Sequence, residues 1–196
     1  MKWHRRRKRH KKTWKSHRKK LIKPLKISFF AKAKHKETTN EIIFGLCDDL
    51  PPAKNPAYLD FLDKTKWIAI VENNHNNSVV FTAIDNCKEF EFLKKGGNMG
   101  ETGKRCDCVL TVDTKIIFVE LKQREFSGWI AKADEQLRST IDYFKKHSDA
   151  KRYLTKQAYI ANSMRPITRT NQLTRIDAFL NDTGYVLRIQ NRIEIT

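Results

Sequence analysis

The first 36 residues of this sequence contain no aspartate and no glutamate. They hold 17 of the 40 lysines and arginines, whereas the remaining 160 residues are nearly neutral, with 23 basic and 22 acidic side chains. The formal net charge of +18 is therefore concentrated at the N-terminus. A segment so dense in one sign of charge repels itself, does not build a core of its own, and favours a polyanionic partner.

Long apolar runs and closely spaced cysteines are also missing. No stretch approaches the run of about 18 apolar residues that crosses a bilayer, and no apolar signal-peptide core follows the basic N-terminus. The four cysteines lack the dense spacing of a secreted disulfide scaffold. We therefore predict a soluble protein of a reducing, intracellular compartment, either cytoplasmic or associated with the nucleoid, with no membrane partner.

At 196 residues, the chain is long enough for one domain with an appendage. We divide it into a basic arm and linker, residues 1–36, and a body, residues 37–196. The arm is expected to bind nucleic-acid phosphates, with DNA favoured over RNA; the alternative is a solubilising or localising tail. The residues assigned to this interaction are Arg5, Arg6, Arg7, Lys8, Arg9, Lys11 and Lys12.

The body alternates helical and extended patterns. We predict a helix from Asn40, which can serve as its N-cap, to Leu50, and a second short helix over 57–64. Residues 67–72 and 78–84 are rich in branched and aromatic side chains and are separated by an Asn-rich turn, so they are expected to form a hairpin. A short strand over 89–93 follows.

The second half of the body continues this alternation. Strands are predicted over 106–112 and 115–122, a helix over 131–146, a strand over 157–161 and a helix over 172–180. Two strands over 185–190 and 192–195 are expected to close the chain as a pair. The order of elements predicts an α/β fold with a mixed sheet flanked by helices.

The strongest chemical signal lies in the segment from Cys106 to Lys122. If Asp113 and Thr114 form a two-residue loop, Asp107 lies opposite Glu120, and Asp107, Glu120 and Lys122 project from one face. An Asp-Thr turn is less favourable than Asp-Gly, so a longer loop with another register is the alternative.

Two carboxylates that face each other in apolar sequence repel and are costly to desolvate, so they require compensation. A divalent cation is the simplest candidate, and oxygen ligands suit Mg²⁺ or Mn²⁺. Such an ion would activate water and neutralise charge on a phosphate, while Lys122 would orient the water or stabilise the transition state. The alternative is an ordinary hairpin whose charges lie at a solvated sheet end.

Asp107 followed by Glu120 and Lys122 in the sequence VELK resembles the Asp…Glu-x-Lys signature of the PD-(D/E)XK phosphodiesterase superfamily, which has the restriction-endonuclease-like fold. The resemblance implies that Asp107 and Glu120 are metal ligands and Lys122 is the catalytic lysine. It further implies an acidic residue on the first helix, for which Glu41 is the best match, with Asp48 and Asp49 as rivals.

The sequence departs from the family pattern in places. Cys106 stands where the family often has proline, and Gln136 matches the family's glutamine on the following helix only in part, because the spacing to Tyr143 differs. The glycine-rich segment before Asp107 is not a P-loop, and we expect its Lys104 and Arg105 to lie near phosphate. Gln136 is assigned with them to nucleic-acid binding. Cys106 and Cys108 are expected to be buried thiols rather than zinc ligands.

Together these features predict a metal-dependent endonuclease that hydrolyses phosphodiester bonds, most readily in DNA, with the arm supplying affinity without sequence preference. A homodimer would suit double-strand cutting, since one such centre cuts one strand. The competing hypothesis is a non-catalytic DNA- or RNA-binding protein on the same scaffold.

Overall fold

A computed structural model describes residues 27–92, 102–123, 127–164 and 172–196. Most of the basic arm, including every arm residue that we assign to phosphate binding, lies outside these ranges. Residues 27–35 lie within them and are part of the folded body: Phe29 is buried in the core, and its backbone N–H donates to the carboxylate of Asp149 at 3.0 Å. The chain therefore joins the body before residue 36.

The body is α/β, as the sequence predicts, with two sheets and two helices among the described residues. One sheet has six strands in the order β1-β5-β6-β7-β8-β9, and the other has four in the order β10-β4-β2-β3. The six-stranded sheet comprises β1 (Lys36–Thr39), β5 (Val79–Ala83), β6 (Cys108–Val112), β7 (Lys115–Lys122), β8 (Thr155–Asn162) and β9 (Val186–Ile189). The four-stranded sheet comprises β10 (Arg192–Glu194), β4 (Ala69–Glu72), β2 (Ile43–Cys47) and β3 (Tyr58–Asp60).

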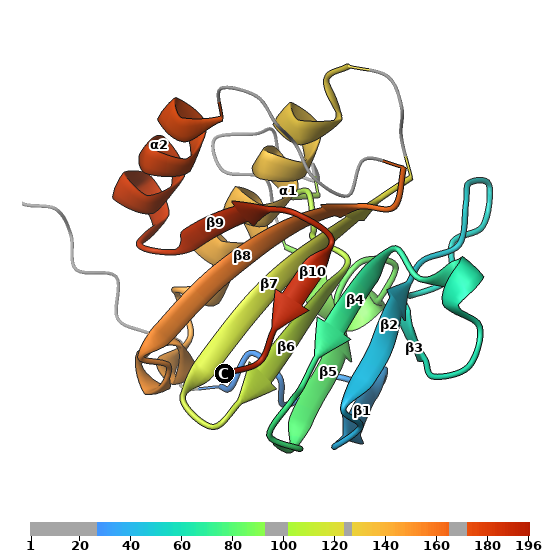
Figure 1. The fold of residues 1–196 in the computed structure, drawn as a ribbon. Helices are drawn as coiled ribbons and strands as arrows, with labels where there is room; N and C mark the ends of the chain where they lie inside the picture. Colours follow the sequence, from blue (N-terminus) through green and yellow to red (C-terminus); the bar gives the residue numbers. More distant parts are fainter. Residues whose placement is uncertain (1–26, 93–101, 124–126, 165–171) are drawn as a thin grey trace, which may run out of the picture.

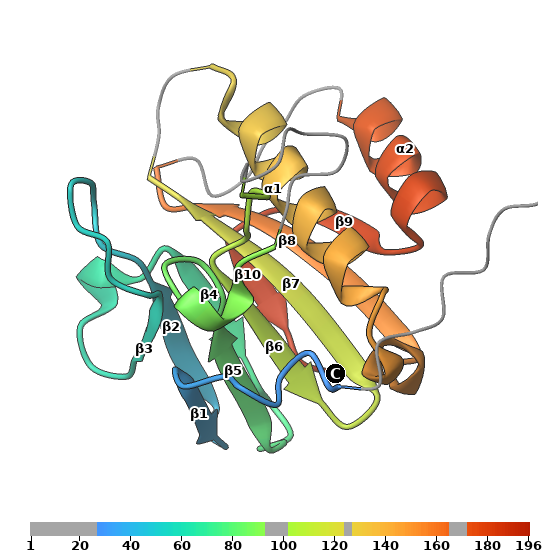
Figure 2. The ribbon, with the colours of Figure 1, turned by 180° about the vertical axis from the view of Figure 1, so that it is seen from behind.

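The elements form three layers. Helices α1 (Trp129–Phe144) and α2 (Leu173–Thr183) cover one face of the six-stranded sheet, and the four-stranded sheet lies on its other face (Figures 1 and 2). Strand β7 is covered on both sides, and all its residues from Ile116 to Leu121 are buried. That double coverage explains why its sequence is almost continuously apolar, and why a charged residue within it requires a special reason.

Strand directions are mixed. The pairs formed among β1, β5, β6 and β7 are antiparallel, whereas β7, β8 and β9 run parallel to one another. The connection from β7 to β8 passes through α1, and the connection from β8 to β9 passes through α2, which is how parallel neighbours are normally joined. Helix α2 ends at Gly184, whose φ of 74° suits the left-handed cap and whose N–H donates to Leu180 O at 2.7 Å.

The prediction of a helix over Asn40–Leu50 is wrong. This segment contains the end of a loop and strand β2, which pairs with β3 on one side and β4 on the other. Its residues Phe44 to Cys47 are all buried, because neighbours from elsewhere in the chain cover both faces of the strand. A short run buried on both faces has no alternation, and its pattern cannot be distinguished from that of a buried helix.

Four further predictions need correction. The segment predicted as a second helix contains β3 and is followed by a 3-10 turn at Lys64–Lys66. The segment predicted as a strand over 89–93 begins within a 3-10 turn at Lys88–Phe90. The strands β4 and β5 exist but belong to different sheets, as do β9 and β10. Both predicted pairs follow each other in sequence, but neighbours in sequence are not always neighbours in space.

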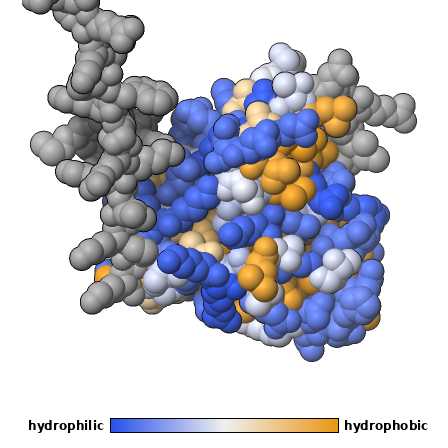
Figure 3. All heavy atoms as spheres, turned by 90° about the vertical axis from the view of Figure 1, so that its left-hand side faces the viewer, coloured by the Kyte–Doolittle hydropathy of each residue, from blue (hydrophilic) through white to orange (hydrophobic). Residues whose placement is uncertain are grey.

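The remaining elements agree with the sequence. Helix α1 buries Ala133, Leu137, Ile141 and Phe144, which recur at the three- and four-residue steps of one helical face. Strands β6, β7 and β8 and helix α2 lie where their patterns predict. On the molecular face at the left of Figure 1, polar side chains predominate and apolar ones gather in small patches (Figure 3). Neither described helix has the length and hydrophobicity that crossing a bilayer requires.

Gly45 in the middle of β2 makes a testable contribution to this architecture. A Cβ atom at this position would overlap the ring of Trp67, which is buried and donates from Nε1 to the Asp60 carboxylate at 2.8 Å. We expect Gly45→Ala to lower the free energy of unfolding by about 1–3 kcal/mol, the usual cost of overpacking. Urea denaturation would measure it, and the loss should shrink when Trp67→Leu is present, because the two changes affect the same pair of neighbours.

Candidate functional site

The hairpin of β6 and β7 has the predicted register. Val112 pairs with Lys115 across the two-residue turn, and Cys108 pairs with Val119 at the other end. Asp113 adopts a positive φ of 47°, a conformation that aspartate tolerates better than most residues, so the turn forms without glycine. Continued one residue beyond the Cys108–Val119 pair, this register places Asp107 opposite Glu120.

Asp107 lies just before β6 and is held from two sides. The residue is 6% exposed, and its Oδ2 accepts a hydrogen bond from the backbone N–H of Leu121 at 2.5 Å. Its own carbonyl accepts from the N–H of Ile84, after β5, at 2.9 Å. The carboxylate is therefore tied to the end of β7 and the backbone to β5, which fixes its position beside Glu120.

Glu120 is completely buried near the end of β7. One of its oxygens, Oε1, forms an ion pair with the ammonium of Lys122, whose side chain is 18% exposed. The other oxygen, Oε2, is buried without a hydrogen-bond partner among the described residues. An unpartnered buried carboxylate oxygen is costly, so this atom marks a place where a further positive group would be stabilised.

Burial dominates the electrostatics of the two acids. Burial raises the pKa of Glu120 well above its usual value, and the neighbouring Asp107 raises it further, against the opposing charge of Lys122. Burial likewise raises the pKa of Asp107 to about 7, although Lys122 and the Leu121 N–H act in the other direction. Desolvation lowers the pKa of Lys122, but the attraction of Glu120 and Asp107 outweighs it, so that pKa lies above its ordinary value.

A third acid, Asp48, lies at this centre, and Glu41 is placed elsewhere. Asp48 follows β2, and its pKa is raised by burial and by Asp85, while Lys122 lowers it. Glu41 is exposed in the loop before β2, at the opposite end of that strand, and the helix expected to carry it does not exist. Asp48 rather than Glu41 is therefore the acid whose charge reaches Lys122 and Asp107.

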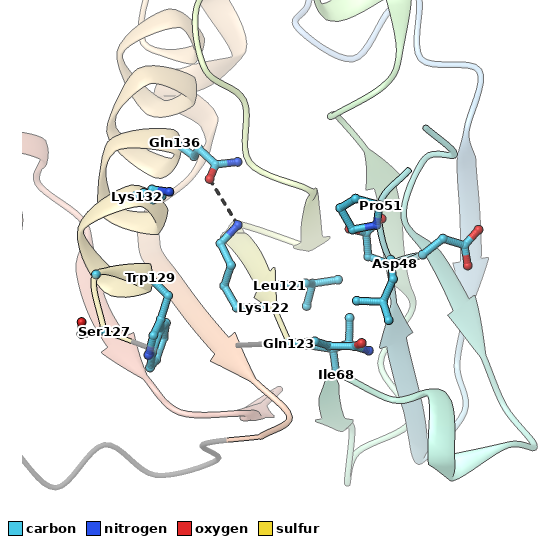
Figure 4. Close-up of a pocket in the computed structure, with 13 residues that line it drawn as sticks. Asp48, Pro51, Ile68, Leu121, Lys122, Gln123, Ser127, Trp129, Lys132 and Gln136 are labelled. Atoms are coloured by element: carbon cyan, nitrogen blue, oxygen red, sulfur yellow. Dashed lines mark hydrogen bonds between the residues drawn. The ribbon is translucent and has the colours of Figure 1, made fainter. Parts of the chain in front are cut away.

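A pocket of about 380 Å³ opens beside Lys122. The start of α1, with Trp129 and Lys132, forms one wall, and the segment after β2, with Asp48 and Pro51, forms the other (Figure 4). Ile68 and Leu121 are apolar members of its lining. No sequence pattern indicates that Pro51 and Ile68 lie beside Lys122, because they come from distant segments that only the folding of the two sheets brings together.

Gln136, Lys104 and Arg105 have different surroundings. The Gln136 side-chain oxygen accepts from the Lys122 ammonium at 3.2 Å (Figure 4). Arg105 is paired with Asp85 at 3.1 Å and donates to Cys87 O, and Lys104 is paired with Glu135 at the surface. Gln136 therefore lies beside Lys122, whereas Lys104 and Arg105 each form an ion pair with an acidic residue of the body. Cys106 and Cys108 are buried free thiols.

The acids can be tested against the requirements of a divalent cation. Within the described ranges, no group of three or more His, Cys, Asp or Glu side chains is arranged to hold a metal ion. The Asp107 and Glu120 pair nevertheless fits Mg²⁺ or Mn²⁺, which bind through one or two carboxylates and keep several waters. The buried, unpartnered Glu120 Oε2 supplies an oxygen of the required kind.

Comparison of the chain with protein-family models, with curated proteins and with solved structures gives no match.

Proposed function

We propose that this protein is a metal-dependent phosphodiesterase that cleaves nucleic acid, most readily DNA, and that its catalytic domain has the restriction-endonuclease-like fold. The observation that carries the proposal is the burial of Asp107 and Glu120 beside Lys122, the member of this group whose side chain lines a pocket. Buried acids with raised pKa values in such a position favour a functional over a structural role. The order β5, β6, β7, α1, β8, with three antiparallel strands and a helical crossover, supports the fold assignment.

In the proposed reaction, Asp107 and Glu120 would hold the cation, and Asp48 is a further acid that lines the same pocket as Lys122. The bound ion would lower the pKa of a water molecule and neutralise charge on the phosphate. Lys122 lies next to Glu120 and lines the pocket, so its ammonium can orient the attacking water and stabilise negative charge on the phosphoryl oxygens. The Leu121 N–H holds the Asp107 carboxylate in place throughout.

The direct test is an assay with supercoiled, linear, single-stranded and branched DNA and with RNA, each with Mg²⁺, with Mn²⁺ and with chelator. We expect cation-dependent hydrolysis of at least one DNA substrate. An absence of cleavage with every substrate and both cations would refute the proposal.

The basic arm is proposed to supply affinity by binding phosphates. Residues 1–20 contain 12 lysines and arginines. We expect their deletion to weaken DNA binding by at least about tenfold at low salt, and to make the slope of log Kd against log salt concentration shallower by about 0.9 for each phosphate that the shortened protein no longer neutralises. Fluorescence anisotropy over a salt series would measure both quantities.

A matched control separates charge from length. Replacing those 12 cations with glutamine keeps the arm but should reproduce the effect of the deletion, because the interaction is electrostatic. If the glutamine variant binds with the same salt slope as the unaltered protein, the arm does not bind phosphate.

A second candidate function is nucleic-acid binding without catalysis. It is favoured by two observations: the described residues contain no preformed three-ligand group, and Lys122 already partners Glu120. In that case the acids and the lysine would be a structural ion pair, and DNA binding would not depend on divalent cations. The nuclease assay and the substitution of Asp107 with asparagine distinguish the two functions.

A further inference from the structure

Two polar side chains interrupt the apolar face of α1 that covers the sheet. Gln136 and Thr140 are one helical turn apart, on the same side of the helix. Thr140 is completely buried, and buried residues of that face include Ala133, Leu137 and Ile141. A polar group kept on a buried face costs free energy unless it is hydrogen bonded, so the partners of these two residues are informative.

Thr140 fixes the chain just before Asp107. Its hydroxyl oxygen accepts a hydrogen bond from the backbone N–H of Cys106 at 2.8 Å and donates to the Gln136 carbonyl at 2.9 Å. The hydrogen bond from Cys106 is buried, and the one to Gln136 is partly buried. The hydroxyl therefore ties α1 to the residue that precedes the first acid of the centre.

Gln136 connects the same chain to Lys122. Its side-chain Nε2 donates to the carbonyl of Arg105 at 2.9 Å, and its Oε1 accepts from the Lys122 ammonium at 3.2 Å. The two hydrogen bonds agree on the orientation of the amide, because a carbonyl can only accept and an ammonium can only donate. The amide thus has a donor partner and an acceptor partner, each on the correct atom.

These hydrogen bonds join the two open ends of the β6–β7 hairpin. Asp107 stands at the start of one strand and Lys122 at the end of the other, far from the turn that sets their register. We propose that Gln136 and Thr140 are positioning residues, which hold the Lys122 ammonium and the Arg105–Cys106 backbone at a fixed separation so that Lys122 and Asp107 act on the same phosphate. This inference rests on the proposed nuclease function.

The proposal differs from a role for Gln136 in contacting nucleic acid, and the two make opposite predictions. For positioning, Gln136→Met should lower kcat about 10- to 100-fold, the usual effect of losing a group that orients a metal or catalytic residue, and leave the Kd for DNA unchanged. For direct binding of nucleic acid, the same variant should raise Kd with little effect on kcat. Single-turnover rates in Mg²⁺ and anisotropy in the absence of cation separate them.

Thr140 offers a sharper pair of variants, because its burial keeps it from touching substrate. We expect Thr140→Val, which preserves shape but removes the hydroxyl, to lower kcat at unchanged Kd, and Thr140→Ser to restore it. Ser139→Ala on the same helix is the control and should retain the original rate. Equal rates for the valine and serine variants, or a change in Kd for Gln136→Met at constant kcat, would overturn the proposal.

Two measurements that need no catalysis keep this inference separate from the nuclease assignment. Hydrogen exchange of the Cys106 amide should be at least about tenfold faster in Thr140→Val than in Thr140→Ser, and the NMR order parameter of the Lys122 ammonium should fall in Gln136→Met. If both effects are seen in a protein that cleaves nothing, the nuclease proposal fails and the hydrogen-bonded connection stands. If neither is seen, the positioning proposal fails whatever the activity.

Discussion

The Asp107→Asn variant is expected to lose cation-dependent DNA cleavage by roughly 10³-fold or more while its affinity for DNA changes little. Asparagine can still accept the Leu121 N–H with its side-chain oxygen, so the hairpin should keep its geometry. The substitution removes one of the two negative charges that would hold the ion in the proposed mechanism, and such an ion would supply several kcal/mol of transition-state stabilisation. Rates with Mg²⁺ or Mn²⁺, and Kd measured by anisotropy without cation, would test this.

Asp113→Asn is the matched control for that substitution. It makes the same chemical change at the exposed turn of the same hairpin, where the positive φ of residue 113 suits asparagine as well as aspartate. We expect full activity from this variant. If Asp107→Asn cleaves DNA as fast as Asp113→Asn, Asp107 does not hold the ion, and the second candidate function gains support.

The metal-free protein should become more stable at alkaline pH when Glu120 is replaced with glutamine. Because burial raises the pKa values of Glu120 and Asp107 in the folded state, the folded protein retains protons that the unfolded chain has lost. Stability therefore falls as pH rises from about 4 towards the folded pKa, which for Asp107 is about 7. At pH 8 the ionised acids should lower the free energy of unfolding by a few kcal/mol, since one unit of pKa shift corresponds to about 1.4 kcal/mol.

Glu120→Gln removes one of the two buried charges, so its gain in Tm over the unaltered protein should be near zero at pH 4 and several degrees at pH 8, at about 2–4 °C per kcal/mol. Mg²⁺ or Mn²⁺ should raise the Tm of the unaltered protein at pH 8 and not that of Glu120→Gln. Thermal denaturation with and without cation measures both effects. The control is Glu37→Gln, at an exposed carboxylate of β1, which should leave the pH profile unchanged; superimposable profiles for all three proteins would contradict the prediction.

The candidate site could be predicted from the sequence because its central part is local. Asp107, Glu120 and Lys122 lie within one hairpin, so a two-residue turn and the alternation of side chains along a strand fix which of them face each other. Gln136 lies on α1, the helix that directly follows β7 in the chain. The resemblance to the PD-(D/E)XK signature adds roles for these residues but is not needed to place them together.

The errors concern residues whose environment is made by distant parts of the chain. The apolar residues Ile42, Phe44 and Leu46 predict a helix that would carry Glu41, but β3 and β4 flank this segment and turn it into a central strand. Asp48, and not Glu41, lines the same pocket as Lys122. Sequence alone places Thr140 on the same helical face as Gln136 but gives it no role, since its hydrogen bond is to the Cys106 N–H that folding brings to it.

By itself the sequence determined the α/β class, the hairpin register and the three side chains at its open end, because turn chemistry and strand alternation act between near neighbours. Tertiary structure decided which strands share a sheet, which acids line the pocket beside Lys122 and how deeply Glu120 is buried. Pairing between β2, β4 and β10, or between β8 and β9, depends on long-range hydrogen bonds and shared burial. The free energy of such pairing depends on two segments at once, so it cannot be predicted from the pattern of either segment alone.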